Sequence, residues 1–201
     1  MKIKEFDGGL TGNQEITVGI DQSLTGFALS AVSVEFPQQH LTWVFKSSFK
    51  GVQRLDDIQT FIANRLWLLK SRGNLPVDVA MEGTVLASHS ALVLGELSAT
   101  VKLFLYEYFD GINEYNPSRP EVCRTPLQIP PMTLKKYATG KGTAKKQEML
   151  LQIYKRWGVE FNDDNAADAY SLGRLCTDLI NGAEGELFDK IKDGAYRDLV
   201  E

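Results

Sequence analysis

ITVGIDQSLTGFALSAV, residues 16–32, is the stretch around which the rest of the chain is expected to be arranged. Its first residues alternate β-branched with small side chains as far as Ile20, and such a run predicts a strand buried at the centre of a sheet. Asp21 follows directly, where an unpaired ionised carboxylate in a core would be costly. A turn over residues 23–26 leads into a second apolar run, residues 27–34. On its own, Asp21 is either a turn residue bonded to its own backbone or a functional carboxylate.

A second strand with an acidic end follows later in the chain. Residues 40–49 alternate loosely and predict a third strand, and residues 53–71 carry apolar side chains at helical spacing. Alternation returns in PVDVAME, residues 76–82, which ends at Glu82. Functional sites gather outside the carboxyl ends of parallel strands, so a site shared by Asp21 and Glu82 is expected.

The longest helical pattern, residues 86–109, is apolar on more than one side. A helix of that kind is buried either in its own core or against a partner, and both alternatives stay open on the pattern alone. After a loop at residues 110–126, the pattern predicts one short strand and three helices, at residues 127–129, 133–139, 143–157 (with Thr143 as N-cap) and 163–181.

Composition limits the class of protein. The 201 residues are 43% hydrophobic and 24% charged, which is ordinary for a globular protein with one substantial core. The sequence has no apolar run close to the roughly 20 residues that span a bilayer. The opening MKIKEFDGGLTGNQE lacks an apolar signal core, so we expect no membrane association and a cytoplasmic location. Cys123 and Cys176 are expected to be reduced thiols.

Positive charge is concentrated in one part of an acidic chain. The net charge is −4, which by itself argues mildly against a nucleic-acid partner. Residues 125–160 nevertheless hold seven basic residues and two acidic ones, an excess that suits a phosphate backbone. The alternative is a solvated helix face, which is the commonest fate of clustered lysines. The basic residues are Lys135, Lys136, Lys141, Lys145, Lys146, Lys155 and Arg156.

The last predicted helix opens with a third group of acids, in DDNAADAY, residues 163–170. Asp168 can share a helix face with Asp164 or Asn165, because residues three or four apart are neighbours on a helix. First-turn acids also serve as caps, but the alanines around Asp168 indicate packing against the sheet. Together with the two acidic strand ends, these oxygen ligands suit Mg²⁺ or Mn²⁺. Two such ions about 3.5–4 Å apart serve in-line displacement at phosphorus.

The ordered motifs resemble those of RuvC-type Holliday junction resolvases, which belong to the ribonuclease H-like superfamily. The matching segments lie within residues 16–180, and their amino-acid sequences are more similar to the phage-encoded branch of the family than to the bacterial housekeeping branch. They are GIDQSLTGFAL, VAMEG, TLKKYATGKGTAKKQEM and NAADAYSLG.

The resemblance implies an α/β fold of the ribonuclease H-like class. Its mixed five-stranded sheet would have three antiparallel strands followed by two parallel ones, flanked by helices. The nuclease domain would span residues 16–181, preceded by a polar lead-in at 1–15 and followed by a peripheral tail at 182–201. The family's dimer helix corresponds to residues 86–109, which favours a homodimer interface there.

Functional residues can be carried over from the family by position. Asp21, Glu82 and Asp168 would bind two Mg²⁺ ions, for which Mn²⁺ would substitute, and Asp164 or Asn165 would complete the set. Lys146 would act in catalysis beside these acids. The family's lysines map best to Lys135 and Lys146, and together with Lys136, Lys141 and Lys145 of the basic segment they are the expected DNA-binding residues.

Two positions depart from the family pattern. Gln22 and Ser23 stand where a proline and a glycine usually follow the first aspartate. Asn165 stands three residues before Asp168, where many members carry another acid. Asn165 could ligate through its amide oxygen, but we favour Asp164, because it shares the helix face and a full negative charge better offsets two divalent ions.

The implied activity is symmetric nicking of four-way DNA junctions that leaves 5′-phosphates. A related nuclease acting on forks or flaps is the main alternative, and a non-catalytic junction-binding protein is another. The opening GIDQSLTG, residues 19–26, also resembles the first phosphate loop of sugar kinases and actin-like ATPases. Those folds need two lobes and a second glycine-rich phosphate loop, which this sequence lacks.

Overall fold

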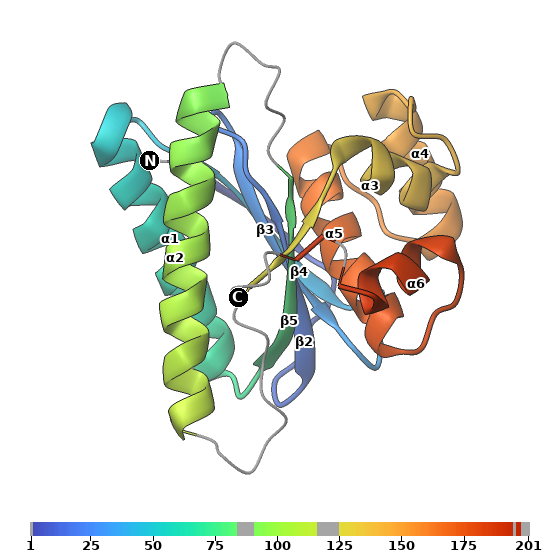
Figure 1. The fold of residues 1–201 in the computed structure, drawn as a ribbon, viewed down its shortest axis with the longest axis horizontal. Helices are drawn as coiled ribbons and strands as arrows, with labels where there is room; N and C mark the ends of the chain where they lie inside the picture. The colour runs from blue at the N-terminus through green and yellow to red at the C-terminus, as the bar shows by residue number, and fades with distance from the viewer. Residues whose placement is uncertain (1, 84–90, 116–124, 195, 198–201) are drawn as a thin grey trace.

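The computed structural model describes residues 2–83, 91–115, 125–194 and 196–197. In the helix at residues 91–115, side chains are described as far as residue 111. Strands and helices follow one another in an α/β order (Figure 1). In chain order they are β1 (Lys2–Asp7), β2 (Glu15–Asp21), β3 (Phe27–Ser33), β4 (His40–Lys46), α1 (Gly51–Ser71), β5 (Leu75–Glu82), α2 (Ala91–Tyr115), β6 (Leu127–Ile129), α3 (Pro131–Thr139), α4 (Lys146–Trp157), α5 (Asp164–Ile180) and α6 (Glu186–Lys192).

The predicted mixed sheet is confirmed. Within the described residues the strand order is β1-β4-β3-β2-β5-β6, with β3 antiparallel to its neighbours β2 and β4, and with β5 and β6 parallel to β2. Asp21 pairs with Ala28 across β2 and β3, and Ile20 pairs with Met81 across β2 and β5. This register places the ends of β2 and β5 side by side, as their acidic ends predicted.

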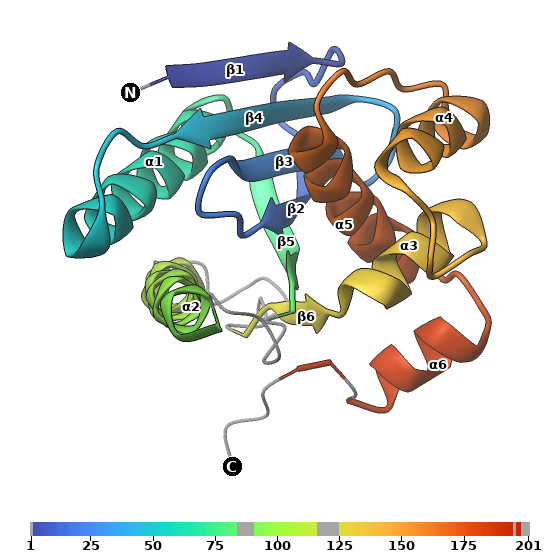
Figure 2. The same ribbon diagram turned by 90° about the horizontal axis from the view of Figure 1, so that it is seen from above.

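The sheet has one strand more than the five expected. Residues 2–7, which were expected to belong to a polar lead-in, form β1 and pair along their whole length with β4 (Figure 2). Most side chains of β1 are exposed, because it is an edge strand. KIKEFD therefore lacks the apolar alternation by which the buried strands are recognised.

Helices cover both faces of the sheet (Figure 1). The helices α1 and α2 pack on one face, where Ile16, Val18 and Ile20 of β2 join their core. The other face, which includes Ala28, Val32 and Ala80, packs against α3, α4 and α5. Central strands covered on both sides account for the nearly complete burial of β2, β3 and β4.

Two glycines let α5 lie directly on β2. A Cβ on Gly19 would stand 1.9 Å from the carbonyl oxygen of Ala169 and 2.3 Å from the amide nitrogen of Gly173. A Cβ on Gly173 would in turn stand 2.8 Å from Val32. Thr17, two residues before Gly19, donates a hydrogen bond to the carbonyl of Gly173 at 2.8 Å. Because side chains alternate along a strand, Asp21 belongs to the same face as Thr17 and Gly19, the face that α5 covers.

Most helix boundaries lie within two residues of the predicted ones, but α6 lies in a tail for which no helix was predicted. Asp163 is the N-cap of α5, and its carboxylate accepts hydrogen bonds from the amides of Asn165 and Ala166. Thr143 is not the N-cap of α4: a turn closed by Ala144 N–H and Lys141 carbonyl delays the helix until Lys146. The helix expected at 86–109 is described from Ala91 and continues to Tyr115.

The acidic tail is attached to the sheet. The amide of Gln128 in β6 donates to the carbonyl of Tyr196 at 2.6 Å. Arg197 pairs with Asp78 of β5 at 2.6 Å and donates to the carbonyl of Thr125. Both members of this pair are largely buried, so the tail is less peripheral than its composition indicates.

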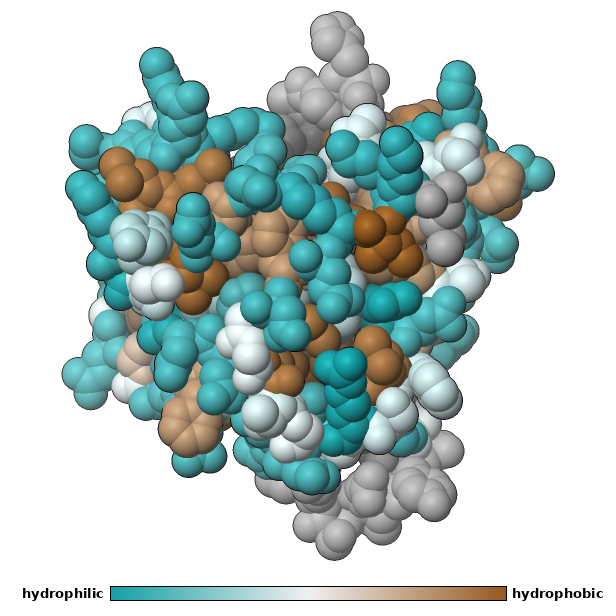
Figure 3. Space-filling view, turned by 180° about the vertical axis from the view of Figure 1, so that it is seen from behind, coloured by the Kyte–Doolittle hydropathy of each residue, from teal (hydrophilic) through white to brown (hydrophobic). Residues whose placement is uncertain are grey.

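Apolar residues on the face seen in Figure 3 form separate patches among hydrophilic side chains. Within the described ranges, no helix has the length and apolar character needed to cross a membrane. Cys176 is a buried thiol, whereas Cys123 lies outside the described residues.

Candidate active site

Three acidic side chains from three different elements interact at the end of the sheet where β2 and β5 finish. Asp21 ends β2, Glu82 ends β5, and Asp168 lies in the second turn of α5. Asp21 is only 4% exposed. The Asp21 and Glu82 carboxyl groups hydrogen bond to one another, and Asp168 interacts electrostatically with both. The structure thus brings together the three acids that the strand ends and the last helix predicted.

Burial and mutual repulsion raise the pKa values of these acids. Burial raises the pKa of Asp21 well above its ordinary value, and the charges of Glu82 and Asp168 raise it further. The pKa of Asp168 rises to about 7, first through burial and then through the charges of Glu82 and Asp164. Burial also raises the pKa of Glu82, against the opposing effects of Asp21 and Lys135. Clustered carboxylates that repel one another in a buried place need protons or cations to remain there.

Asp164 and Asn165, the two candidates for a fourth ligand, point to different neighbours. Asp164 pairs with Lys146, and this hydrogen bond lowers the pKa of Asp164 although partial burial acts in the opposite direction. The charge of Asp164 raises the pKa of both Asp21 and Asp168. The amide nitrogen of Asn165 instead lies against Gly26, 2.4 Å from where a Cβ would stand. Asp164 is therefore the electrostatic neighbour of the acidic cluster.

Two of the five predicted DNA-binding lysines act on the cluster. Lys135 of α3 lowers the pKa of Glu82 and of Asp168, and Lys146 of α4 interacts with Asp164, Asp168 and Asp21. The other three, Lys136, Lys141 and Lys145, are placed further out. Lys141 pairs with Glu148 at 3.6 Å, Lys145 is the N-cap of α4, and Lys136 lines a hollow of about 680 Å³ between α3 and α6.

Two residues near the cluster escaped the sequence-based prediction. The side chain of Gln22 donates a hydrogen bond to the carbonyl of Glu82, so it joins the ends of β2 and β5. Lys46, the last residue of β4, contributes to lowering the pKa of Asp164. Lys46 could have been predicted from the strand order, because β4 ends on the same side of the sheet as β2 and β5, which carry the acids.

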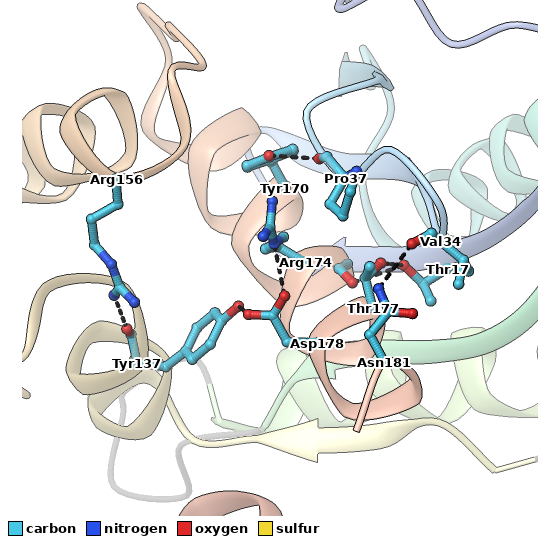
Figure 4. A network of polar contacts seen from close by, with 11 residues as sticks. Thr17, Val34, Pro37, Tyr137, Arg156, Tyr170, Arg174, Thr177, Asp178 and Asn181 are labelled. Carbon is cyan, nitrogen blue, oxygen red and sulfur yellow. Dashed lines mark hydrogen bonds and ion pairs between the residues drawn. The ribbon is translucent and has the colours of Figure 1, made fainter. Parts of the chain in front are cut away.

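A polar network ties the lysine-bearing helices to α5 (Figure 4). The hydroxyl of Tyr137 in α3 donates to Asp178 of α5 at 2.7 Å, and Arg174 donates to the same carboxylate at 2.9 Å. Arg156 of α4 donates to the carbonyls of Tyr137 and Ala138 near the end of α3. Trp157 packs between these groups, 5.6 Å from the ring of Tyr137 and 5.8 Å from that of Tyr170. The network fixes α3 and α4 relative to the helix that carries Asp168.

The acids suit a hard divalent cation by donor type and by charge. Their oxygen atoms are currently engaged with one another and with Lys146. Among the residues with a described placement, no group of three or more acidic, histidine or cysteine side chains is arranged to hold a metal ion in this structure. A bound cation would displace any proton held by these carboxyl groups, and its positive charge would relieve the repulsion among them.

The strand order, with helices on both faces and an acidic sheet edge, defines a fold of the ribonuclease H-like class. More particularly, the chain has the fold of RuvC. It aligns with the Thermus thermophilus RuvC structure over 83% of this chain and 96% of that one, with a TM-score of 0.60 and 21% identity. It also aligns with T. thermophilus RuvC in complex with a Holliday junction substrate, over 79% of this chain and 90% of that one, with a TM-score of 0.58 and 20% identity.

Comparison at the level of sequence found no relative. No family model matches the chain. The search of curated proteins likewise returned no match. The RuvC-like fold is thus shown by structure, and it confirms the fold that the four ordered motifs predicted.

Proposed function

We propose that the protein is a homodimeric, Mg²⁺-dependent endonuclease that resolves four-way DNA junctions by paired symmetric nicks and leaves 5′-phosphates. The observation that carries the proposal is the group of Asp21, Glu82 and Asp168 at one sheet edge, with Lys135 and Lys146 acting on it. A fold shared with a protein solved on a Holliday junction supports branched DNA as the substrate.

In this proposal Asp21, Glu82, Asp168 and Asp164 hold two Mg²⁺ ions, for which Mn²⁺ substitutes, with Asn165 as the alternative fourth ligand. The ions would supply an activated water and charge stabilisation at the leaving oxygen. Lys146 neutralises charge that develops on the phosphate, while Lys135, Lys136, Lys141 and Lys145 contact the backbone. Water attacks the phosphorus and the bond to the 3′ oxygen breaks. The products are a 3′-hydroxyl and a 5′-phosphate, without a covalent protein intermediate.

Symmetric nicking requires two sites, and α2 is the proposed dimer helix. Leu97, Val101 and Leu105 of α2 face the core, but large apolar side chains also remain on its outer surface. Leu92 is 79% exposed and Leu103 is 60% exposed. An outward apolar stripe on a helix suits burial against a second copy. A phage origin and action in the cytoplasm of the host cell are part of the same proposal.

Cleavage of synthetic DNA tests this function directly. Four-way junctions, forks, flaps and linear duplex would be compared in Mg²⁺ and in EDTA. Paired 5′-phosphate nicks on junctions in Mg²⁺ alone would support the proposal. Preferential cleavage of forks or flaps would assign the same site to another branched DNA. Junction binding without cleavage in Mg²⁺ or Mn²⁺ would indicate a non-catalytic junction-binding protein.

A further inference from the structure

The end of the sheet at which β2 and β5 finish with acidic residues also carries a basic segment, which follows β4. The strands β2, β4 and β5 run in the same direction, since β3 is antiparallel to both β2 and β4 and β5 is parallel to β2. Their last residues, Asp21, Lys46 and Glu82, consequently lie at one edge. Phe27, opposite Phe45 in the register, begins β3 at this same edge. Lys46 therefore stands two strands away from Asp21.

The chain continues from Lys46 into a segment without acidic residues. Residues 46–54, KSSFKGVQR, hold Lys46, Lys50 and Arg54, and we call them the basic loop. They connect β4 with α1, which lies on the sheet face opposite to α4 (Figure 1). The acidic cluster is thus placed between the basic loop on one side and the lysines of α3 and α4 on the other.

Internal hydrogen bonds give the basic loop a defined shape. The hydroxyl of Ser47 donates to Asp57 at 2.6 Å and accepts from the amide of Phe49 at 3.1 Å. The side chain of Arg54 donates to the carbonyl of Phe49 at 3.0 Å. Asp57 of α1 therefore accepts a hydrogen bond from the loop, while its neighbour Asp56 is exposed. Lys46 and Lys50 remain exposed at the surface.

The surroundings of the basic loop favour an anionic partner. Lys46 is paired in register with Lys2 of β1, and like charges directly opposite one another on two strands repel. A phosphate between them would relieve that repulsion. Phe49, between the two lysines in sequence, is 48% exposed and offers an apolar ring beside the charges. Basic groups interleaved with an exposed aromatic ring are typical of surfaces that follow a nucleic-acid strand.

We infer that the basic loop is a second DNA-contacting element, which holds the backbone on the α1 side while the lysines of α3 and α4 hold it on the other. The inference rests on the proposed function, because it assigns the substrate of the same site. A DNA strand that crosses the acidic cluster would then contact positive charge on both sides of the phosphate that is cleaved. Lys46, at the end of the sheet that holds Asp21 and Glu82, would contact the phosphate nearest to the site, and Lys50 one further along.

Binding measurements on a synthetic four-way junction test the inference. Fluorescence anisotropy in EDTA would be recorded at several salt concentrations for wild type, Lys46→Gln, Lys50→Gln and the double variant. Each lysine removed should weaken binding about three- to tenfold and reduce the salt slope by about one, as for a lost phosphate contact. The matched control is Lys70→Gln, at the other end of α1 and roughly 30 Å away, which should bind as wild type does.

The possible results distinguish a failure of the inference about the basic loop from a failure of the proposed function. Loop variants that bind like Lys70→Gln would overturn the inference, even if the wild type cleaves junctions. Wild type that binds but does not cleave would overturn the proposed activity, while weaker binding by the loop variants would still support the inference. Lys46→Arg keeps the charge and should restore binding, and Lys50→Gln carries the test alone if Lys46→Gln does not fold. A wild type without affinity for any junction would overturn both.

Discussion

The side chain of Gln22 donates a hydrogen bond to the main-chain carbonyl of Glu82, and so joins the ends of the two strands that carry Asp21 and Glu82. Gln22 is almost fully buried. Within the pattern that the sequence resembles, this position departs from the usual proline. A glutamine here provides the link through its side chain, whereas proline would provide stiffness through its ring.

Replacing Gln22 should therefore impair catalysis more than folding. Gln22→Met keeps the shape and removes the hydrogen bond, which should lower the rate of junction cleavage about tenfold by loosening Glu82. The free energy of unfolding should fall by only about 1 kcal/mol. The control is Gln39→Met, because Gln39 accepts a hydrogen bond from Gln14 at the opposite end of the sheet. Equal cleavage by the two variants would show that the link has no part in the reaction.

Asp21 should be required for cleavage but dispensable for binding. Asp21→Asn keeps the hydrogen-bonding shape and removes the charge, so junction cleavage in Mg²⁺ should fall by about a thousandfold or more. Junction affinity should stay within about twofold, since the acids repel rather than attract phosphate. Gel-based cleavage and anisotropy measure the two quantities. Cleavage at the wild-type rate would remove Asp21 from the active site.

The fourth ligand can be decided by two neighbouring variants. Asp164 affects the pKa values of Asp21 and Asp168, whereas Asn165 lies against Gly26. Asp164→Ala should raise the Mg²⁺ concentration needed for half-maximal cleavage about tenfold or more, and Asn165→Ala should change it little. A larger effect of Asn165→Ala would reverse the assignment. Asn165→Asp serves as the control, since it adds the charge that many RuvC-like proteins would carry there.

The raised pKa of Asp168 predicts how stability depends on pH without metal. In the folded protein Asp168 keeps its proton up to about pH 7, whereas in the unfolded chain it loses it near pH 4. The native state thus binds more protons than the unfolded state between these values, and the free energy of unfolding should fall as pH rises through this range. Thermal unfolding in EDTA from pH 5 to pH 8 measures this fall.

Two comparisons identify the source of that pH dependence. Asp168→Asn should make the fall shallower, because its amide does not titrate, while Asp21 and Glu82 keep raised pKa values of their own. Mg²⁺ should raise the melting temperature more at pH 8 than at pH 5, because the ion competes with the proton for the same oxygen atoms. A melting temperature that rises with pH in EDTA would contradict the raised pKa of Asp168.

The sequence pointed to those candidate site residues whose charge conflicts with the burial that the neighbouring apolar residues predict. An acid at the end of a β-branched run is conspicuous, so Asp21 and Glu82 could be proposed from the sequence, and the alanines around Asp168 identified the buried face of α5. Lys46 and Gln22 gave weaker signals, because a lysine or glutamine at the end of a strand is ordinary unless the strand order is known. The edge strand β1 escaped for the opposite reason, since exposure on both sides removes the periodicity that marks a strand.

Tyr137 should position the lysines of α3 and α4 rather than act on DNA itself. Its hydroxyl donates to Asp178 at 2.7 Å, and Lys135 lies two residues earlier in the same helix (Figure 4). Tyr137→Phe should lower the free energy of unfolding by about 1–2 kcal/mol. It should also raise KM for the junction several-fold, with a smaller effect on kcat, because the lysines lose their fixed distance from the acids.

Tyr170→Phe is the chemically matched control for this prediction. The hydroxyl of Tyr170 donates to the carbonyl of Pro37 at 2.8 Å and also hydrogen bonds with Arg174, so the same substitution disturbs α5 while leaving the bond between Tyr137 and Asp178 in place. Both variants should lose similar stability, measured by urea unfolding, but only Tyr137→Phe should change KM and the salt slope of binding. If the two variants lower stability equally and leave KM unchanged, the contact between Tyr137 and Asp178 serves the fold alone. A change in KM confined to Tyr137→Phe would instead tie the spacing between α3 and α5 to DNA binding, because stability loss is common to both proteins.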